Sequence, residues 1–111
     1  MPVLKYQEKE YEIDQEGFLL DTNTWDEDFV RACAQKDQLE LTENHWEIIL
    51  MLRAYFQEYD YVPNTRGLSK VVARRLGEEK GEIKYLETLF PGAPGALSSR
   101  YAGLPKPVGC V

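Results

Sequence analysis

The sequence has few of the residues from which disulfide-rich, metal-binding or membrane-spanning proteins are built. It contains two cysteines and one histidine in 111 residues, too few for a disulfide framework or for a metal site with recognisable ligand spacing. Its longest apolar run covers only residues 48–52, whereas a membrane helix needs about 20 apolar residues. It has no glycine-rich phosphate loop and no nucleophile elbow. The sequence therefore predicts no cofactor, no metal and no membrane contact.

The start of the chain also lacks the apolar core of a secretory signal peptide, because Met1 to Val3 are soon followed by charged residues. With so few cysteines, this favours the cytoplasm, where thiols stay reduced. What is present suits an ordinary globular protein, since 43% of residues are hydrophobic and 29% are charged. The length corresponds to a single domain.

Charge is distributed unevenly along the chain. Residues 1–61 hold five Lys or Arg and fifteen Asp or Glu, whereas residues 62–111 hold eight and four, for a total net charge of −6. An acidic first half and a basic second half suggest oriented docking on a charged partner. The alternative is a solvated surface whose charge is merely uneven.

Hydrophobic spacing predicts a mainly α fold of the α+β class, in which a small N-terminal β-hairpin packs on a bundle of about five helices. Alternating residues place the hairpin within residues 4–20 and the helical body within residues 24–103. Thr24, followed by Glu27, predicts a capping box at the start of the first helix, and Thr42 is expected to cap the second. Further helices are expected over residues 68–76, 83–90 and 96–102.

One of the two cysteines belongs to the expected core. Cys33 stands four residues after Phe29 and three after Val30, a spacing that puts all three on one helical face. Since cysteine is among the most frequently buried residues, packing is favoured over a redox role.

The other cysteine lies in a different setting. Residues 104–111 have no periodicity and two prolines, which predicts an extended, flexible C-terminal arm outside the domain formed by residues 1–103. The seven steps from Gly103 to Cys110 span roughly 20–25 Å when extended, so that the Cys110 thiol could enter another protein's active site. Arg100 and Lys106 are expected to steer the arm and to favour the reactive thiolate. A tail cysteine without function is the alternative.

The arm also carries a specific resemblance. Residues 100–111, RYAGLPKPVGCV, resemble the C-terminal arm of the DsrC/TusE family of small sulfur-carrier proteins, also called the gamma subunit of dissimilatory sulfite reductase. The similarity extends through residues 39–46, LELTENHW, and 89–91, LFP, and so covers nearly the whole chain. The family's known architecture, a hairpin followed by a helical body, agrees with the hydrophobic pattern.

The resemblance implies a sulfurtransferase-type role, in which Cys110 accepts sulfur as a persulfide and passes it on. It implies a donor like TusBCD or DsrEFH, and as acceptor either a tRNA thiolase that makes 2-thiouridine or a sulfite reductase. Members that act with sulfite reductase carry a second arm cysteine at the position of Ser99, and serine cannot form their disulfide. The similarity therefore favours the single-cysteine TusE type, or a related carrier in sulfur oxidation.

Two other functions remain open from the sequence. The helix-turn-helix expected over residues 68–90, with basic residues nearby at Arg66, Lys70, Arg74 and Arg75, is compatible with a DNA-binding regulator that senses sulfur status. The acidic net charge and the few base-reading side chains argue against direct nucleic-acid binding. The third possibility is an accessory protein docked on a sulfite reductase, which Ser99 disfavours.

Overall fold

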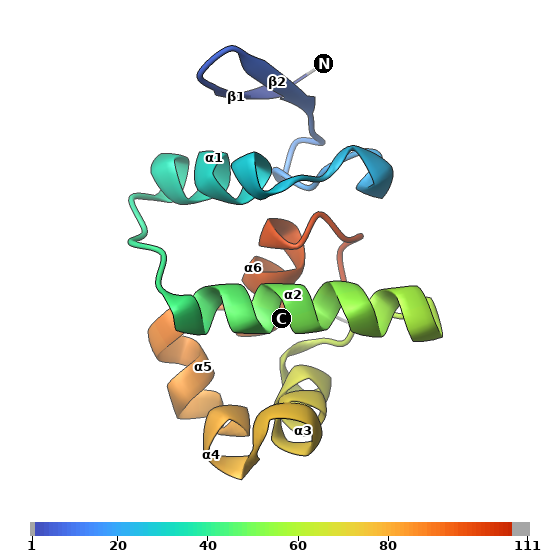
Figure 1. The fold of residues 1–111 in the computed structure, drawn as a ribbon, viewed down its shortest axis with the longest axis vertical. Helices are drawn as coiled ribbons and strands as arrows, with labels where there is room; N and C mark the ends of the chain where they lie inside the picture. The colour runs from blue at the N-terminus through green and yellow to red at the C-terminus, as the bar shows by residue number, and fades with distance from the viewer. Residues whose placement is uncertain (1, 108–111) are drawn as a thin grey trace.

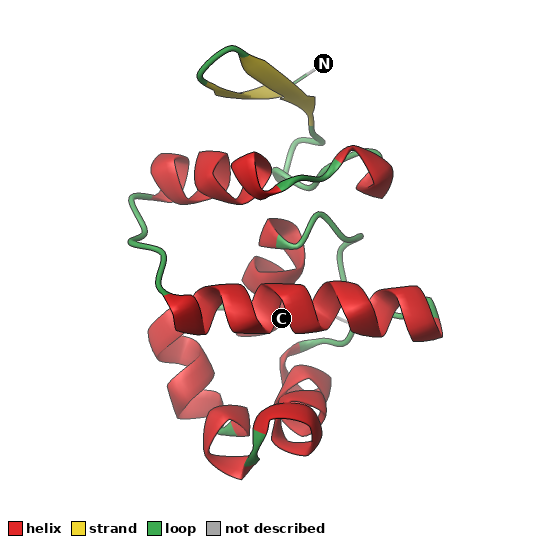
Figure 2. Cartoon of the chain, viewed as in Figure 1, coloured by secondary structure: helices red, strands yellow, loops and turns green. Residues whose placement is uncertain are grey.

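The computed structural model describes residues 2–107 and shows a two-stranded hairpin above six α-helices and one short 3₁₀ helix (Figures 1 and 2). The molecule measures 39 × 28 × 21 Å, with the hairpin at one end of the long axis. The α+β architecture expected from the sequence is thus confirmed. None of the helices in the described part of the chain is long and apolar enough to cross a membrane.

The hairpin pairs β1 (Val3–Tyr6) with β2 (Lys9–Glu12) in antiparallel register. Leu4 lies opposite Tyr11, and both side chains are buried against the body, while their neighbours along each strand are more exposed. The Tyr11 ring packs edge-on against Phe29 of the first helix at 5.3 Å, and its hydroxyl donates to Asp26 at 2.6 Å. A lone hairpin is marginal in water, so these contacts are what hold it in place.

The first α-helix, α1 (Glu27–Asp37), begins two residues later than the sequence predicts. Its N-cap is Asp26, whose carboxylate accepts from the backbone N–H of Phe29 at 3.0 Å. Thr24 instead ends the 3₁₀ helix η1 (Thr22–Thr24), where its hydroxyl donates to the carbonyl of Asp21. The predicted capping box at Thr24 is therefore wrong, because aspartate is an equally good cap and lies nearer to the helix.

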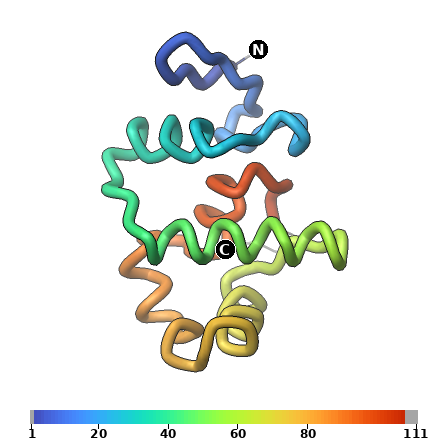
Figure 3. The backbone as a smooth tube through the Cα atoms, in the orientation of Figure 1, coloured from blue at the N-terminus to red at the C-terminus, as the bar shows by residue number. Residues whose placement is uncertain are grey.

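The second helix, α2 (Glu43–Tyr59), begins after Thr42 as predicted and crosses the full width of the molecule (Figure 3). Three helices, α3 (Thr65–Leu76), α5 (Ile83–Leu89) and α6 (Pro94–Tyr101), follow the remaining predictions within two or three residues. An additional helix of one turn, α4 (Glu78–Gly81), occupies the expected turn between α3 and α5.

Helix α6 lies at the centre of the body, where it contacts α1, α2, α3 and α5. Its first turn meets the start of α3 at Gly95, whose N–H donates to the Thr65 hydroxyl at 2.9 Å. A Cβ atom at Gly95 would lie 2.4 Å from the backbone nitrogen of Thr65. Close helix contact here depends on the missing side chain. The core around α6 consists of fully buried side chains from every long helix: Phe29, Val30, Ile48, Ile49, Leu52, Leu68, Val72, Leu86, Phe90 and Tyr101.

His45 joins the start of α2 to the end of α5. Its Nδ1 accepts from the backbone N–H of Thr42 at 3.1 Å, and its Nε2 donates to the carbonyl of Leu89 at 2.8 Å. The His45 side chain thus caps the start of α2, and its ring is buried. Burial lowers the pKa of the imidazole below its usual value, and the Thr42 contact requires an unprotonated Nδ1.

We expect the Gly95→Ala substitution to destabilise the protein by about 1–3 kcal/mol, because the new methyl group meets backbone atoms that cannot move aside. A glycine in an unobstructed helix would instead gain roughly 0.5–1 kcal/mol of stability from the same change. Urea unfolding of the parent and the variant measures the sign of the difference. A Gly95→Ala protein as stable as the parent would contradict the close contact of α3 and α6.

We also expect His45 to make stability depend on pH. Because the pKa of His45 is lowered on folding, the unfolded chain binds the extra proton first, and stability is complete above a pH of about 6.5 and declines as the pH falls below it. Urea unfolding between pH 8 and pH 5 should show this decline in the parent and a weaker one in His45→Gln, which retains hydrogen-bonding groups but does not titrate. Equal slopes for the two proteins would rule out this histidine as the cause.

Candidate functional site

The C-terminal arm leaves the body at the end of α6, through a tight turn. The N–H of Gly103 bonds to the carbonyl of Arg100 at 3.1 Å, and the N–H of Leu104 bonds to the carbonyl of Ser99 at 3.0 Å. This pair of bonds is a Schellman motif, in which the residue after the helix adopts a left-handed conformation. Gly103 does so with φ of +70°, and its lack of a side chain makes the turn possible.

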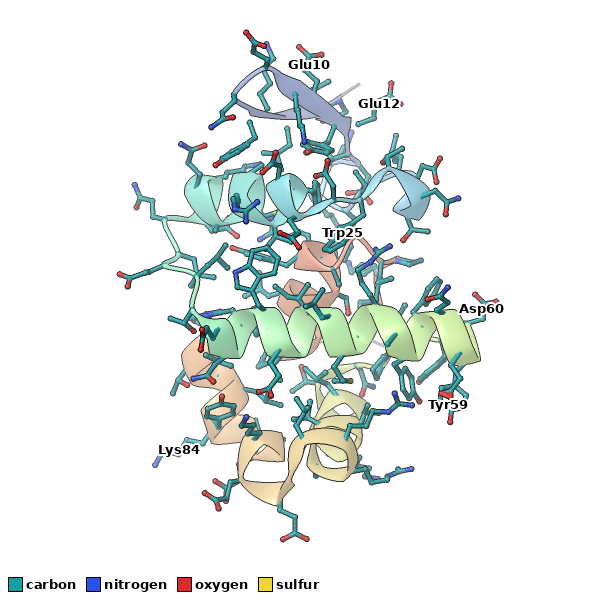
Figure 4. The ribbon with its side chains drawn as sticks, in the orientation of Figure 1. Glu10, Glu12, Trp25, Tyr59, Asp60 and Lys84 are labelled. Carbon is teal, nitrogen blue, oxygen red and sulfur yellow. The ribbon has the colours of Figure 1, made fainter. Side chains whose placement is uncertain are left out.

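Two side chains hold this turn from outside, and we call Trp25 and Arg53 the arm anchor. The Trp25 indole N–H donates to the carbonyl of Tyr101 at 2.9 Å, and the Arg53 guanidinium donates to the carbonyl of Ala102 at 2.7 Å. The guanidinium stacks on the Trp25 ring at 4.1 Å. Figure 4 shows Trp25 between the α1 level and α2, close to α6. The arm anchor thus pairs backbone carbonyls that the end of a helix would leave unpaired.

Gly103 packs directly on the arm anchor. A Cβ atom at this position would lie 2.5 Å from Cδ1 of Trp25, so no other residue fits without displacing the indole. Arg53 is half-buried beside it, and none of the carboxylates within residues 2–107 forms an ion pair with it. Burial lowers the pKa of this guanidinium, which nonetheless stays charged at neutral pH. Among residues 2–107, the positive charge at the base of the arm therefore has no carboxylate partner.

Arg100, expected to steer the arm, lies within the body. Its guanidinium forms an ion pair with Asp37 at the end of α1, and its side chain is 12% exposed. The neighbouring Tyr101 hydroxyl donates to the same carboxylate at 2.8 Å. Arg100 also packs over Gly17, where a Cβ atom would lie 3.2 Å from Nη1. These contacts make Arg100 a link between α6 and α1, and its steering role stays a prediction.

The first residues of the arm are packed on the body rather than free. Leu104 and Pro107 are buried, and Lys106 forms an ion pair with Glu16 at 2.6 Å. Residues 104–107 form no helix or strand, as an extended arm predicts, and the burial of Leu104 and Pro107 attaches this part of the arm to the body. The division of the chain into a domain of residues 1–103 and an arm of residues 104–111 stays a prediction.

Ser99 and Cys33 both lie within the body of the protein. Ser99 is buried inside α6, and its hydroxyl donates to the carbonyl of Gly95 at 2.7 Å. Cys33 is fully buried, as its helical spacing predicts, and burial raises its pKa to about 12. Its thiol is therefore protonated and inert at neutral pH. Cys110, the predicted sulfur acceptor, lies outside the described residues.

Sequence reasoning did not identify the arm anchor or the role of Asp37. Trp25 is separated from Tyr101 by 76 positions and Arg53 from Ala102 by 49, and no local pattern relates residues so far apart. The only available signal was Gly103 at the end of a predicted helix, which marks a turn but not its partners. Within residues 2–107, no three His, Cys, Asp or Glu side chains gather in a way that could hold a metal ion.

Known proteins provide an independent comparison. The family model described as "DsrC like protein" matches residues 5–111. A relative from Haemophilus influenzae, named "Sulfurtransferase TusE homolog", is 45% identical over 92% of this chain and 94% of its own length.

Two solved structures share the fold. DsrC from Allochromatium vinosum has a TM-score of 0.88 and 46% identity over 98% of this chain and 97% of its own. The oxidised gamma subunit of the dissimilatory sulfite reductase from Archaeoglobus fulgidus has a TM-score of 0.81 and 39% identity, with 99% of this chain and all of that chain covered.

These matches extend over almost the whole of each chain, so that body and arm are both included. Because this protein is similar to a named sulfurtransferase over most of its length, it has a sulfurtransferase-type role in a sulfur relay. The family model spans residues 5–111 and the two solved structures share the fold, so the chain belongs to the DsrC-like family.

Proposed function

We propose that this protein carries sulfur on Cys110, accepting it as a persulfide from one protein and delivering it to the next. The burial of the Cys33 thiol is the observation that carries the proposal. Cys33 is fully buried with a raised pKa, which leaves Cys110 as the thiol for exchange chemistry. The full-length likeness to a sulfurtransferase supports the same assignment.

The reaction is a thiol exchange that needs no cofactor. The Cys110 thiolate attacks the outer sulfur of a donor persulfide, a new S–S bond forms on Cys110, and the donor's S–S bond breaks to release a thiolate. The proton of the persulfide stays on the transferred sulfur or returns to the released thiolate. In delivery, an acceptor thiolate attacks the outer sulfur on Cys110 in the same way, and Cys110 is restored without net oxidation.

The partners we propose are proteins of a relay in the cytoplasm. A complex like TusBCD or DsrEFH would act as the donor, and a tRNA thiolase that makes 2-thiouridine would act as the acceptor. Ser99 supports this choice, because serine has no thiol and cannot form a disulfide with Cys110; its hydroxyl is buried and donates to the Gly95 carbonyl instead. The likeness to a sulfite reductase gamma subunit keeps such a reductase as the second candidate acceptor.

Replacing Cys110 should abolish sulfur loading while the fold survives. The Cys110→Ser protein is expected to take up no sulfur from a persulfide-loaded donor, because serine does not attack sulfane sulfur. Cys33→Ala, which removes the buried thiol instead, should load like the parent. Intact-protein mass spectrometry with peptide mapping, before and after reductant, measures both. Loading of Cys110→Ser, or loss of loading in a folded Cys33→Ala protein, would refute the assignment.

Lys106 should accelerate transfer through its charge. We expect Lys106→Glu to slow transfer from a protein donor about three- to tenfold at low salt and much less at high salt, because salt screens exposed charges. The rate is measured by quenched-flow mass spectrometry at several ionic strengths.

The ion pair with Glu16 offers a control for this prediction. In the double variant Glu16→Lys/Lys106→Glu the pair is reversed but retained, so a purely local role of Lys106 would be restored. Transfer that stays slow in the double variant supports steering of the partner. Full recovery would limit Lys106 to holding the arm on the body.

A further inference from the structure

The position of Pro107 limits where a relay partner can bind, if Cys110 is the carrier as proposed above. Leu104 and Pro107 are buried, so the chain that leads to Cys110 starts from the body at Pro107. Three residue steps span at most about 11 Å. A partner must bring its reacting sulfur within that reach, and a stable interface covers about 800 Å² on each protein. The partner therefore also covers the surface around the base of the arm.

That surface contains a hollow of about 430 Å³ between η1, α2 and the start of the arm. Its lining includes Thr22, Asn23, Leu50, Arg53, Gln57 and Leu104. Leu104 of the arm forms one wall of the hollow, and Arg53 of the arm anchor forms another. Occupation of the hollow is thus physically coupled to the segment from which Cys110 extends.

The chemistry of the lining is unusual for this part of the chain. Leu50 is 50% exposed in the middle of α2, so the hollow presents a large apolar side chain, the kind of group that forms the core of a protein interface. None of the described residues that line the hollow carries a carboxylate, although residues 1–61 carry fifteen. Arg53 supplies a positive charge that no carboxylate of residues 2–107 neutralises.

We propose that this hollow is where protein partners of the relay dock, with an apolar side chain placed on Leu50 and a carboxylate opposite Arg53. Such an occupant matches both features, since it covers exposed apolar surface and neutralises a half-buried guanidinium. It also places the partner beside the base of the arm, where the reach of Cys110 requires it.

The experiment separates docking from sulfur chemistry by measuring binding in a protein that cannot react. In a Cys110→Ser background, isothermal titration with a purified TusBCD-like donor gives the Kd without transfer. Leu50→Glu should raise this Kd about tenfold or more, since it places a charge where an apolar contact forms. Ile83→Glu is the matched control, because Ile83 is 47% exposed on α5 and lines a different hollow, to which the described arm residues 104–107 do not contribute. It should leave the Kd unchanged.

Placing a charge at position 57 tests whether the partner presents a carboxylate opposite Arg53. Gln57 is exposed on α2 and lines the hollow, and Glu and Lys both suit a helix. If the partner presents a carboxylate, Gln57→Glu should raise the Kd several-fold at low salt, whereas Gln57→Lys should keep or lower it. Equal effects of the two variants would overturn the carboxylate assignment.

Transfer assays with Cys110 present complete the test. Loading from a small persulfide such as glutathione persulfide should be the same in the parent, Leu50→Glu and Ile83→Glu, while loading from the protein donor should fall only in Leu50→Glu. Binding that is equal in Leu50→Glu and Ile83→Glu would overturn the docking site. If the parent protein took no sulfur on Cys110 from either source, the carrier function would fail, yet the Kd values would still decide where the partner binds.

Discussion

The arrangement of this protein depends on how the last turn of α6 is held. A helix end leaves carbonyl groups that need donors, and here the donors come from Trp25 and Arg53, which belong to different parts of the chain. Because these side chains also stack on one another, the η1 segment, α2 and α6 are joined at the same point. The direction in which the arm leaves the body is thereby determined by the core and not by the arm itself.

The proposed function assigns incompatible tasks to the two cysteines. A thiol in the core adds packing but must stay protonated, and burial does this for Cys33. A thiol that exchanges sulfur needs its thiolate and access to another protein, and a short tether beyond an anchored segment provides reach without opening the core. The central α6 has few ways to move, since Gly95 and Gly103 each bring it against a neighbour with no space for a methyl group.

Local patterns were enough to predict the elements whose signals are local. The hairpin, the cap at Thr42 and the burial of Cys33 each follow from residues a few positions apart. The cap at Asp26 was missed because two acceptable caps lie close together, and the hydrogen bonds that favour Asp26 come from Tyr11 and Lys9, 15 and 17 positions away. The packed residues 104–107 and the arm anchor were not predictable, because their partners lie 49 or more positions away.

Part of the basic charge in residues 62–111 is paired with acidic side chains of residues 1–61. Four bases of the second half form ion pairs with acids of the first: Arg75 with Glu58, Lys80 with Glu47, Arg100 with Asp37 and Lys106 with Glu16. The pairs of Arg75, Lys80 and Lys106 are exposed and contribute only about 0–1 kcal/mol each, so they orient segments more than they stabilise them. Arg53 is the contrasting case, a cation of the acidic half without an ion pair among residues 2–107. An acidic partner at the base of the arm would therefore compete with Glu16 for Lys106 but with no carboxylate of the described chain for Arg53, which makes Arg53 the more effective of the two cations for holding a docked protein.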